Sequence, residues 1–309
     1  MKIAVMGAGG VGGYYGARLA AAGEEVAFIA RGAHLAAIRA RGLRVESARG
    51  DVHIHPAFAT EDAAEVGPVD VVPFAVKLWD TEAAGAAVRP LLGPGTAVIS
   101  LQNGVVAEER LSDILGREHV MGGVSIIFSS IVEPGVIRHT GAVARLIFGE
   151  LDGARSARAE AFLAACRRAR LDVRLSTNIE KDLWEKFVYL VALSGLTSLK
   201  RSPLGPILED PESRAMFKAA IAEAVAVARA QGVPLAPDVV ETLLAMSEGL
   251  PGEVRSSMLD DLERGARLEL PWLSGAVVRM GRELGVETPV HSLIVDALER
   301  HAMGRPREG

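Results

Sequence analysis

Short apolar runs alternate with amphipathic runs through the first half of the chain. The apolar runs cover residues 2–7, 25–30, 69–76 and 95–101. They are apolar at successive positions rather than at every second one, which is typical of parallel strands covered on both faces. The segments between them, such as 12–23, have the apolar spacing of helices. This alternation predicts βαβ units and therefore an α/β fold with a doubly wound, mostly parallel sheet.

Two features modify this sheet. Pro73 lies inside the third run and has no N–H group, which favours an edge strand, a strand end or a bulge. Residues 119–149 are rich in β-branched side chains around a Pro-Gly turn at 134–135, and they predict further strands, some antiparallel, that extend the sheet.

The second half of the chain has a different pattern, in which nearly every segment has helical periodicity. The expected helices cover residues 180–194, 211–231, 237–248, 252–264, 271–285 and 289–302. Proline and glycine residues separate them. We therefore expect two domains, an α/β domain of residues 1–177 and an all-helical domain of residues 178–309, in keeping with a length of 309 residues.

Charge and hydropathy exclude several classes of protein. The net charge is −5 and the arginines are scattered, so no basic excess is present for binding nucleic acid. The longest apolar run, residues 187–199, is too short to span a bilayer. Glycines interrupt the apolar run at the N-terminus, so a secretion signal is not expected. These features favour a cytoplasmic protein without membrane or nucleic-acid partners.

The single cysteine and the histidines indicate no metal site. Cys166 lies within an amphipathic helical pattern and is expected to be a packed core thiol in a protein of a reducing compartment. The seven histidines form no cluster with the spacing of metal ligands.

A glycine-rich segment follows the first predicted strand directly and opens the first helix. Gly7, Gly9 and Gly12 form the G-x-G-x-x-G pattern of Rossmann-type dinucleotide-binding domains. The first glycine permits the tight turn, the second lets the backbone approach the pyrophosphate, and the third allows close packing of helix on strand. The residues expected at the pyrophosphate are Gly7, Ala8, Gly9, Gly10, Val11 and Gly12.

The end of the second strand indicates which coenzyme binds. NAD-binding domains normally carry an acid there for the ribose 2′-hydroxyl, whereas this chain has Arg31 and no acid between Val26 and Val45. A guanidinium would pair with a 2′-phosphate, so we expect NADP(H). The alternative is that Arg31 is a solvated loop residue.

Two polar residues follow later strands of the sheet. Lys77 ends one apolar run and Asn103 follows another, and ligands in such folds lie beyond the carboxyl ends of the strands. We expect both side chains beside the nicotinamide. Alternatively, Lys77 faces solvent and Asn103-Gly104 is a turn pair.

One lysine occupies an apolar stripe of the first helix in the second half. Lys186 shares that stripe with Leu183, Leu190 and Leu193. An ordinary ion pair with Asp182, four residues earlier, is one explanation. The other is a proton donor, because an ammonium stabilises a developing alkoxide and can release its proton.

Several motifs together resemble those of the ketopantoate reductase (2-dehydropantoate 2-reductase) family. They are GAGGVG at 7–12, AR at 30–31, VK at 76–77, LQNG at 101–104, LWEKF at 183–187 and SSMLDDLERG at 256–265. The similarity extends from end to end. It implies NADPH-dependent reduction of 2-dehydropantoate to pantoate, a step of pantothenate biosynthesis, or of a close analogue.

The resemblance also implies roles for individual residues. Lys186 would be the proton donor, and Lys77 and Asn103 would contact cofactor and substrate. Ser257 would bind the substrate carboxylate and Glu269 would hydrogen-bond at the site. Glu269 could instead stabilise a helix start ahead of Pro271, and Ser257 could be a helix-surface residue.

The chain departs from the family in the predicted substrate-binding residues. Asparagines expected four and eight residues after Lys186 are replaced by Leu190 and Ser194. Leu204 stands at the position of a third expected asparagine, and Ser274 stands at the position of the asparagine expected after Glu269. Ser194 remains a candidate substrate contact. Replacement of hydrogen-bonding groups by leucine changes substrate preference strongly, so the substrate is either 2-dehydropantoate or another branched or bulkier 2-oxo acid.

Two other functions are compatible with the cofactor motifs. One is a non-catalytic NADP(H)-binding redox sensor, which would have no use for Lys186 and Glu269. The other is a β-hydroxyacid dehydrogenase working in the oxidative direction, which Arg31 and the surroundings of Lys186 disfavour. The apolar faces of the helical half allow a homodimer but do not require one.

Overall fold

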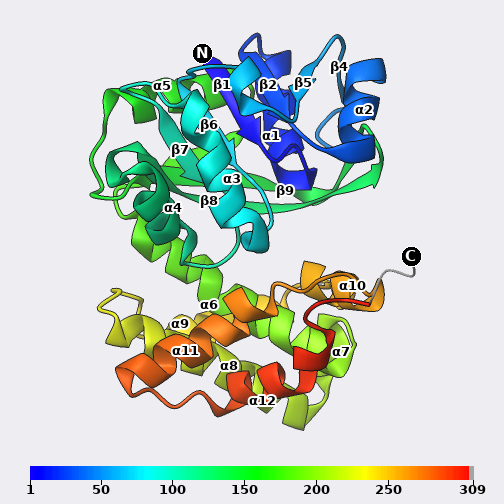
Figure 1. The fold of residues 1–309 in the computed structure, drawn as a ribbon. Coiled ribbons are helices and arrows are strands. Elements are labelled where there is room, and N and C mark those ends of the chain that lie inside the picture. The colour runs from blue at the N-terminus through cyan, green and yellow to red at the C-terminus, as the bar shows by residue number, and fades with distance from the viewer. Residues whose placement is uncertain (306–309) are drawn as a thin grey trace. The chain divides into compact units, whose positions relative to one another are not determined.

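The computed structural model describes residues 1–305. The chain divides into two compact units, Met1–Asp182 and Leu183–Gly309 (Figure 1). The boundary between them falls inside one helix, α6 (Ile179–Lys200).

The first unit is built on one sheet in the order β4-β3-β9-β8-β7-β6-β1-β2-β5, with β10 also paired to β9. β3 pairs with β4, and β8 with β9, in antiparallel fashion, while the other described pairs are parallel. The strands are β1 (Lys2–Met6), β2 (Glu25–Ile29), β3 (Leu43–Ser47), β4 (Val52–Ile54), β5 (Phe58–Thr60), β6 (Val71–Phe74), β7 (Ala97–Ser100), β8 (Val120–Glu133), β9 (Val136–Glu150) and β10 (Asp172–Leu175). The predicted doubly wound, mostly parallel sheet is confirmed.

Helices cover both faces of this sheet (Figure 1). They are α1 (Gly10–Ala21), α2 (Gly32–Arg41), α3 (Thr81–Val88), α4 (Ala107–Leu115) and α5 (Ala157–Arg168). The strand β1 is apolar at successive positions because its side chains enter a core on each face of the sheet. Ile3 and Val5 enter the core beneath α1 and α5, and Ala4 and Met6 enter the core beneath α3 and α4.

Cys166 lies in the core beneath α5 and is fully buried. Burial raises the pKa of its thiol to about 12, so the unreactive thiol form predominates at neutral pH. The prediction of a packed core thiol is confirmed.

Pro73 does not lie on an edge strand, because β6 has β1 on one side and β7 on the other. Its pairing with β7 is regular, and Pro73 is in register with Ile99. On the β1 side the paired positions are Val71 and Phe74, which flank the proline. The missing N–H of Pro73 thus falls where the hydrogen-bonded pairing with β1 is interrupted. The expectation of an edge strand is wrong.

The long hairpin of β8 and β9 turns at Pro134-Gly135, as the sequence predicts, and Gly135 has a φ of +85°. The short strands β3, β4 and β5 were not predicted. β4 and β5 have three residues each, too few to show a periodicity.

The second unit is all-helical in its described part. Its other helices are α7 (Leu204–Glu209), α8 (Pro211–Ala230), α9 (Val239–Glu248), α10 (Ser257–Glu263), α11 (Ser274–Leu284) and α12 (Pro289–Leu298). The helix α8 packs against α7, α9, α11 and α12. The predicted end of α6 at residue 194 is too early, because Gly195 serves packing: a Cβ there would lie 2.6 Å from Ile294 Cδ1 of α12.

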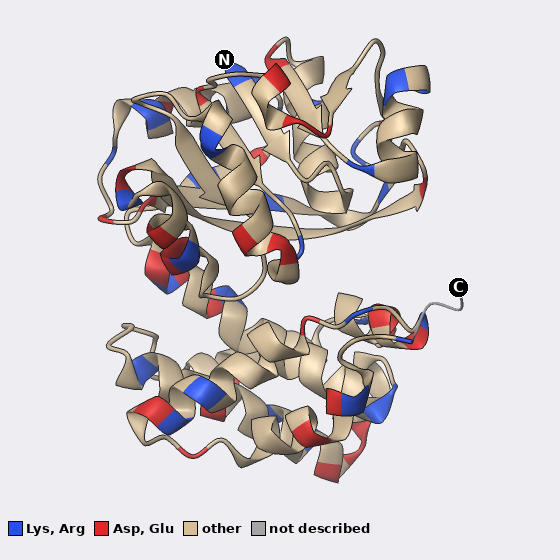
Figure 2. Ribbon diagram, in the orientation of Figure 1, with Lys and Arg blue, Asp and Glu red and all other residues tan. Residues whose placement is uncertain are grey.

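Lysine and arginine are interspersed with aspartate and glutamate over the helices and loops of each unit (Figure 2). Among the helices within residues 1–305, none is both long and apolar enough to cross a membrane.

Candidate cofactor and catalytic sites

The glycine-rich loop after β1 is bonded to the end of β2. The N–H groups of Gly7 and Ala8 both donate to the carbonyl of Ile29, at 3.2 and 3.0 Å. Gly7 has a φ of +91°, which only glycine adopts without strain. The loop is therefore fixed beside the last residue of the neighbouring strand.

The three glycines of the motif have different surroundings. A Cβ on Gly12 would lie 2.3 Å from the Gly7 carbonyl oxygen and 2.9 Å from Val5, so this glycine permits close packing of helix on strand. A Cβ on Gly10 would lie 2.3 Å from the carbonyl oxygen of Ser129 on β8. A Cβ on Gly9 would meet nothing within 4 Å. Open space at Gly9 is what a backbone approached by a pyrophosphate requires.

The start of α1 suits an anion. Gly9 is its N-cap residue and supplies no capping side chain, and the first turn contains no acid. The first N–H groups of a helix have no partner within the helix, and its dipole favours negative charge there. The residues present therefore fit a dinucleotide pyrophosphate.

Arg31 is exposed and is the N-cap residue of α2, two residues after Ile29. Because Ile29 also holds the glycine loop, Arg31 leaves the sheet beside that loop. In dinucleotide-binding domains the residue at this position contacts the ribose 2′ group of the coenzyme.

Lys77 and Asn103 follow the neighbouring strands β6 and β7. Lys77 is exposed, with its Nζ 5.5 Å from the ring centroid of Trp79, and Asn103 is half-buried. Their two loops are joined by Gln102, whose Nε2 donates to the Val76 carbonyl at 3.1 Å.

Gln102 and His34 are two residues of this region that the sequence did not single out. Gln102 is only 6% exposed and also donates to Thr81 Oγ1 at 2.9 Å. The sequence feature that could have identified Gln102 is its position directly before Asn103. His34 bonds to the carbonyl of Ala8 in the glycine loop, and no motif pointed to it.

Lys186 lies on α6 in the second unit and is half-buried. The competing explanation was an ion pair with Asp182. The two carboxylate oxygens of Asp182 accept hydrogen bonds from Arg174 and from Ser176. Asp182 is thus engaged at the end of β10.

Glu269 is 7% exposed and precedes the short 3-10 turn Leu270–Trp272. Its side chain accepts no capping bond from the described backbone of that turn. Glu269 therefore supplies no hydrogen-bonded cap to this turn.

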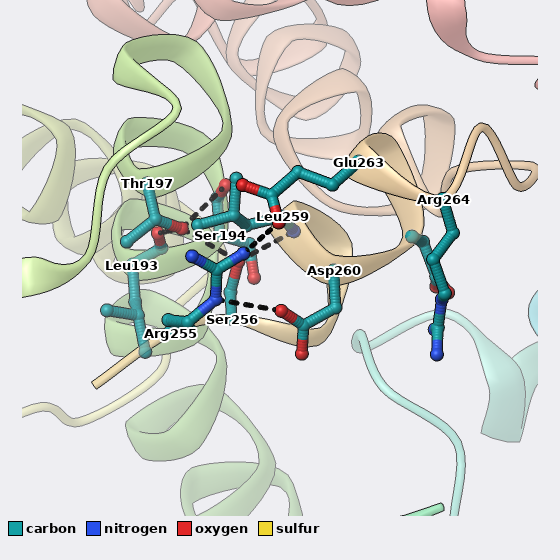
Figure 3. A network of polar contacts seen from close by, with 10 residues as sticks. Leu193, Ser194, Thr197, Arg255, Ser256, Leu259, Asp260, Glu263 and Arg264 are labelled. Carbon is teal, nitrogen blue, oxygen red and sulfur yellow. Dashed lines mark hydrogen bonds and ion pairs between the residues drawn. The ribbon is translucent and has the colours of Figure 1, made fainter. Parts of the chain in front are cut away.

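Ser256 and Ser257 have different surroundings at the start of α10. Ser257 is exposed, whereas Ser256 is buried and its Oγ accepts the N–H of Leu259 at 3.1 Å. Ser256 Oγ also lies 2.7 Å from Thr197 Oγ1 of α6 (Figure 3).

The donors in this contact can be assigned. Thr197 donates its hydroxyl proton to the carbonyl of Leu193 at 2.6 Å, so Ser256 donates to Thr197. A directed chain of hydrogen bonds thus joins α10 to α6, the helix that carries Lys186. In the same network Arg255 pairs with the half-buried Asp260 and the exposed Glu263 (Figure 3).

The side chains that replace the family's asparagines are largely buried. Leu204 and Ser194 are each 1% exposed, and Leu190 is half-buried. Ser274 is fully buried and its Oγ lies 3.2 Å from Nδ1 of His291. Within residues 1–305, the hydroxyl of Ser194 has no hydrogen-bond partner.

Known proteins resemble this chain over its whole length. Residues 3–153 match the family described as ketopantoate reductase PanE/ApbA, and residues 178–302 match its C-terminal part. Similar relatives are the uncharacterized oxidoreductase YkpB of Bacillus subtilis (strain 168), 34% identical with 97% of this chain and 99% of the relative covered, and a 2-dehydropantoate 2-reductase of Mesorhizobium japonicum, 32% identical with 99% of each covered.

Solved structures agree with this relationship. The crystal structure of 2-dehydropantoate 2-reductase from Geobacter metallireducens GS-15 superposes with a TM-score of 0.90 at 33% identity, covering 97% of this chain and 99% of that one. The chain therefore belongs to the ketopantoate reductase family of oxidoreductases.

Proposed function

We propose that this protein reduces a 2-oxo acid, 2-dehydropantoate or a close branched analogue, with NADPH as the coenzyme. The open space at Gly9, beside an uncapped helix start and Arg31, is the observation that supports it most directly. The names of the relatives that cover nearly the whole chain support the same reaction.

We assign coenzyme binding to the first unit. The backbone from Gly7 to Gly12, with Ala8, Gly10 and Val11 between the motif glycines, would hold the pyrophosphate at the start of α1. Arg31 would pair with the 2′-phosphate. Lys77 and Asn103, at the ends of adjacent strands, would flank the nicotinamide.

We assign the proton to the second unit. When bound, NADPH supplies a hydride for C2 of the 2-oxo acid. Lys186 then transfers a proton from Nζ to the carbonyl oxygen, so that the product is the 2-hydroxy acid. Glu269 would orient the ammonium, and Ser257 would bind the substrate carboxylate.

The residues that stand in place of the family's asparagines favour a substrate with fewer polar groups than the family's usual one. Leu190 and Leu204 stand where asparagines are expected, and neither can hydrogen-bond a substrate hydroxyl. Ser194 keeps one hydroxyl, buried and without a partner in the described chain. We assign it to the substrate.

Two substrates that differ by one hydroxyl test this assignment. NADPH oxidation is followed with 2-dehydropantoate and with 3,3-dimethyl-2-oxobutanoate, which has the same branched skeleton without the terminal hydroxyl. Turnover of either supports the reductase, and the ratio of the two kcat/KM values identifies the preferred group. Tight NADPH binding without turnover on a broad 2-oxo acid panel would favour the redox sensor instead.

The proton donor is tested by Lys186→Ala. We expect kcat to fall by about 10²–10⁴-fold, the usual contribution of a positioned acid, with little change in NADPH affinity. Lys200→Ala, an exposed lysine at the end of the same helix, is the matched control and should keep wild-type turnover. Equal turnover in Lys186→Ala would remove this residue from the mechanism.

A further inference from the structure

His34 joins three segments of the first unit. It lies in the first turn of α2, and its Nε2 is 2.9 Å from the carbonyl oxygen of Ala8 in the glycine loop. Its Nδ1 is 3.0 Å from the backbone nitrogen of Gly135, in the turn between β8 and β9. The half-buried ring therefore bonds the glycine loop on one side and the hairpin on the other.

The partners determine which ring nitrogen carries the proton. A carbonyl oxygen can only accept, so Nε2 donates to Ala8. A backbone N–H can only donate, so Nδ1 accepts from Gly135. The imidazole is neutral in this arrangement, and burial lowers the pKa of His34, which favours the same neutral form.

The bond to Ala8 completes the fixation of the glycine loop. On its other side the loop donates the N–H groups of Gly7 and Ala8 to Ile29. Arg31 caps α2 three residues before His34. The imidazole thus fixes the first turn of α2, with Arg31 at its start, against the loop that would carry the pyrophosphate.

We propose that His34 is a positioning residue for NADP(H): its Nε2–H bond to Ala8 sets the place of the pyrophosphate loop relative to Arg31. This inference rests on the proposed function, because it needs the coenzyme to bind at that loop. A residue that only stabilised the fold would affect unfolding but not favour one coenzyme. The positioning role predicts a larger effect on NADPH than on NADH, because only NADPH carries the phosphate that Arg31 would bind.

Two isosteric variants separate the two ring bonds. In His34→Gln the amide nitrogen can take the place of Nε2 and still donate to Ala8. In His34→Asn the shorter side chain can reach only the place of Nδ1 and still accept from Gly135. We expect His34→Gln to keep NADPH affinity within about twofold, and His34→Asn to weaken it about tenfold, as for loss of one hydrogen bond and its alignment.

The experiment measures dissociation constants of NADPH and NADH by fluorescence titration, together with the KM for the 2-oxo acid. His119→Gln is the control, because His119 is also half-buried and bonds a backbone carbonyl, that of Thr96, through Nδ1, a place that the glutamine amide does not take. It should leave the NADPH dissociation constant unchanged. The KM for the 2-oxo acid should be the same in all the variants.

Wild-type NADPH affinity in His34→Asn, or equal weakening in His34→Gln and His34→Asn, would overturn the positioning role. Failure of the wild-type protein to bind NADPH would instead overturn the proposed coenzyme. If His34→Asn does not fold, the wild-type protein still provides a test: the Nε2 proton of His34 should exchange more slowly with solvent when NADPH is bound, and an unchanged rate would contradict the proposal.

Discussion

At the scale of the residue, the proposed preference for NADP(H) rests on one charge. Arg31 is exposed, stands at the start of α2 and follows the residue that holds the glycine loop. An exposed guanidinium contributes little to folding, so its replacement should change coenzyme binding without a large change in stability.

We therefore predict that Arg31→Asp weakens NADPH binding by at least about tenfold and NADH binding little, because the aspartate repels the 2′-phosphate. The measurement is a pair of titrations with the two coenzymes. Arg167→Asp, which makes the same charge change at an exposed position of α5, is the control for net charge. Equal weakening by both variants would mean that long-range charge, and not a contact, is responsible.

The sequence was informative for residues with a motif and uninformative for residues that act through backbone groups. Gly7, Gly9 and Gly12 could be assigned different roles because their spacing has a known geometry. His34 and Gln102 bond to carbonyls of distant segments, and no local pattern shows which carbonyl a side chain will meet.

At the scale of the element, the start of α1 combines a packed face and an open face. Gly12 is closed in by Gly7 and Val5, whereas Gly9 faces open space with a φ of −73° that any residue adopts. A methyl group would thus obstruct an approaching coenzyme at Gly9, whereas at Gly12 it would disturb the packing of helix on strand.

We predict that Gly9→Ala lowers NADPH affinity several-fold with an unchanged melting temperature, because the methyl occupies the approach of the pyrophosphate. Gly12→Ala should lower stability by about 1–3 kcal/mol, since its Cβ would lie 2.3 Å from a backbone oxygen. Thermal unfolding and coenzyme titration of both variants provide the comparison. A destabilised Gly9→Ala with normal affinity would contradict the open-face interpretation.

Elements were predictable where length and periodicity were sufficient. The strands β1, β2 and β7 and the helix α8 follow directly from apolar patterns. The end of α6 could not be predicted in this way. A glycine normally suggests a helix end, but Gly195 is inside α6 because the helix packs closely against α12 there. A single-sequence pattern contains no information about that contact.

At the scale of the whole molecule, stability should depend on pH through a buried imidazole. His291 is fully buried in the second unit, and its Nε2 donates to the carbonyl of Ala220 at 3.0 Å. Its Nδ1 accepts from Ser274, so both ring nitrogens are used by the neutral form. Burial lowers the pKa of His291 to about 4.

The sign follows from this lowered pKa. The unfolded chain, with a histidine pKa of about 6.5, binds the proton before the folded chain does. The contribution to stability is complete above about pH 6.5 and is lost as the pH falls towards 4. We predict that this residue alone removes about 2 kcal/mol of the unfolding free energy between about pH 7 and pH 5.

Urea unfolding at both pH values measures this loss. His291→Gln is the control, because the amide nitrogen can take the place of Nε2 and still donate to Ala220, and the amide does not titrate. Its unfolding free energy should fall less over the same interval. The same pH dependence in both proteins would show that His291 is not the group responsible.

The hydrogen-bond chain from Leu259 through Ser256 and Thr197 to Leu193 restricts which amino acids can occupy positions 197 and 256. Each hydroxyl must give one proton and receive another inside a packed helix contact, and serine and threonine are the residues of that size that do both well. The side chains of Leu190 and Leu204 neither donate nor accept hydrogen bonds, so no bonding requirement fixes their identity. The proposed change of substrate preference at Leu190 and Leu204 therefore leaves the two hydroxyls of the α6–α10 contact in place.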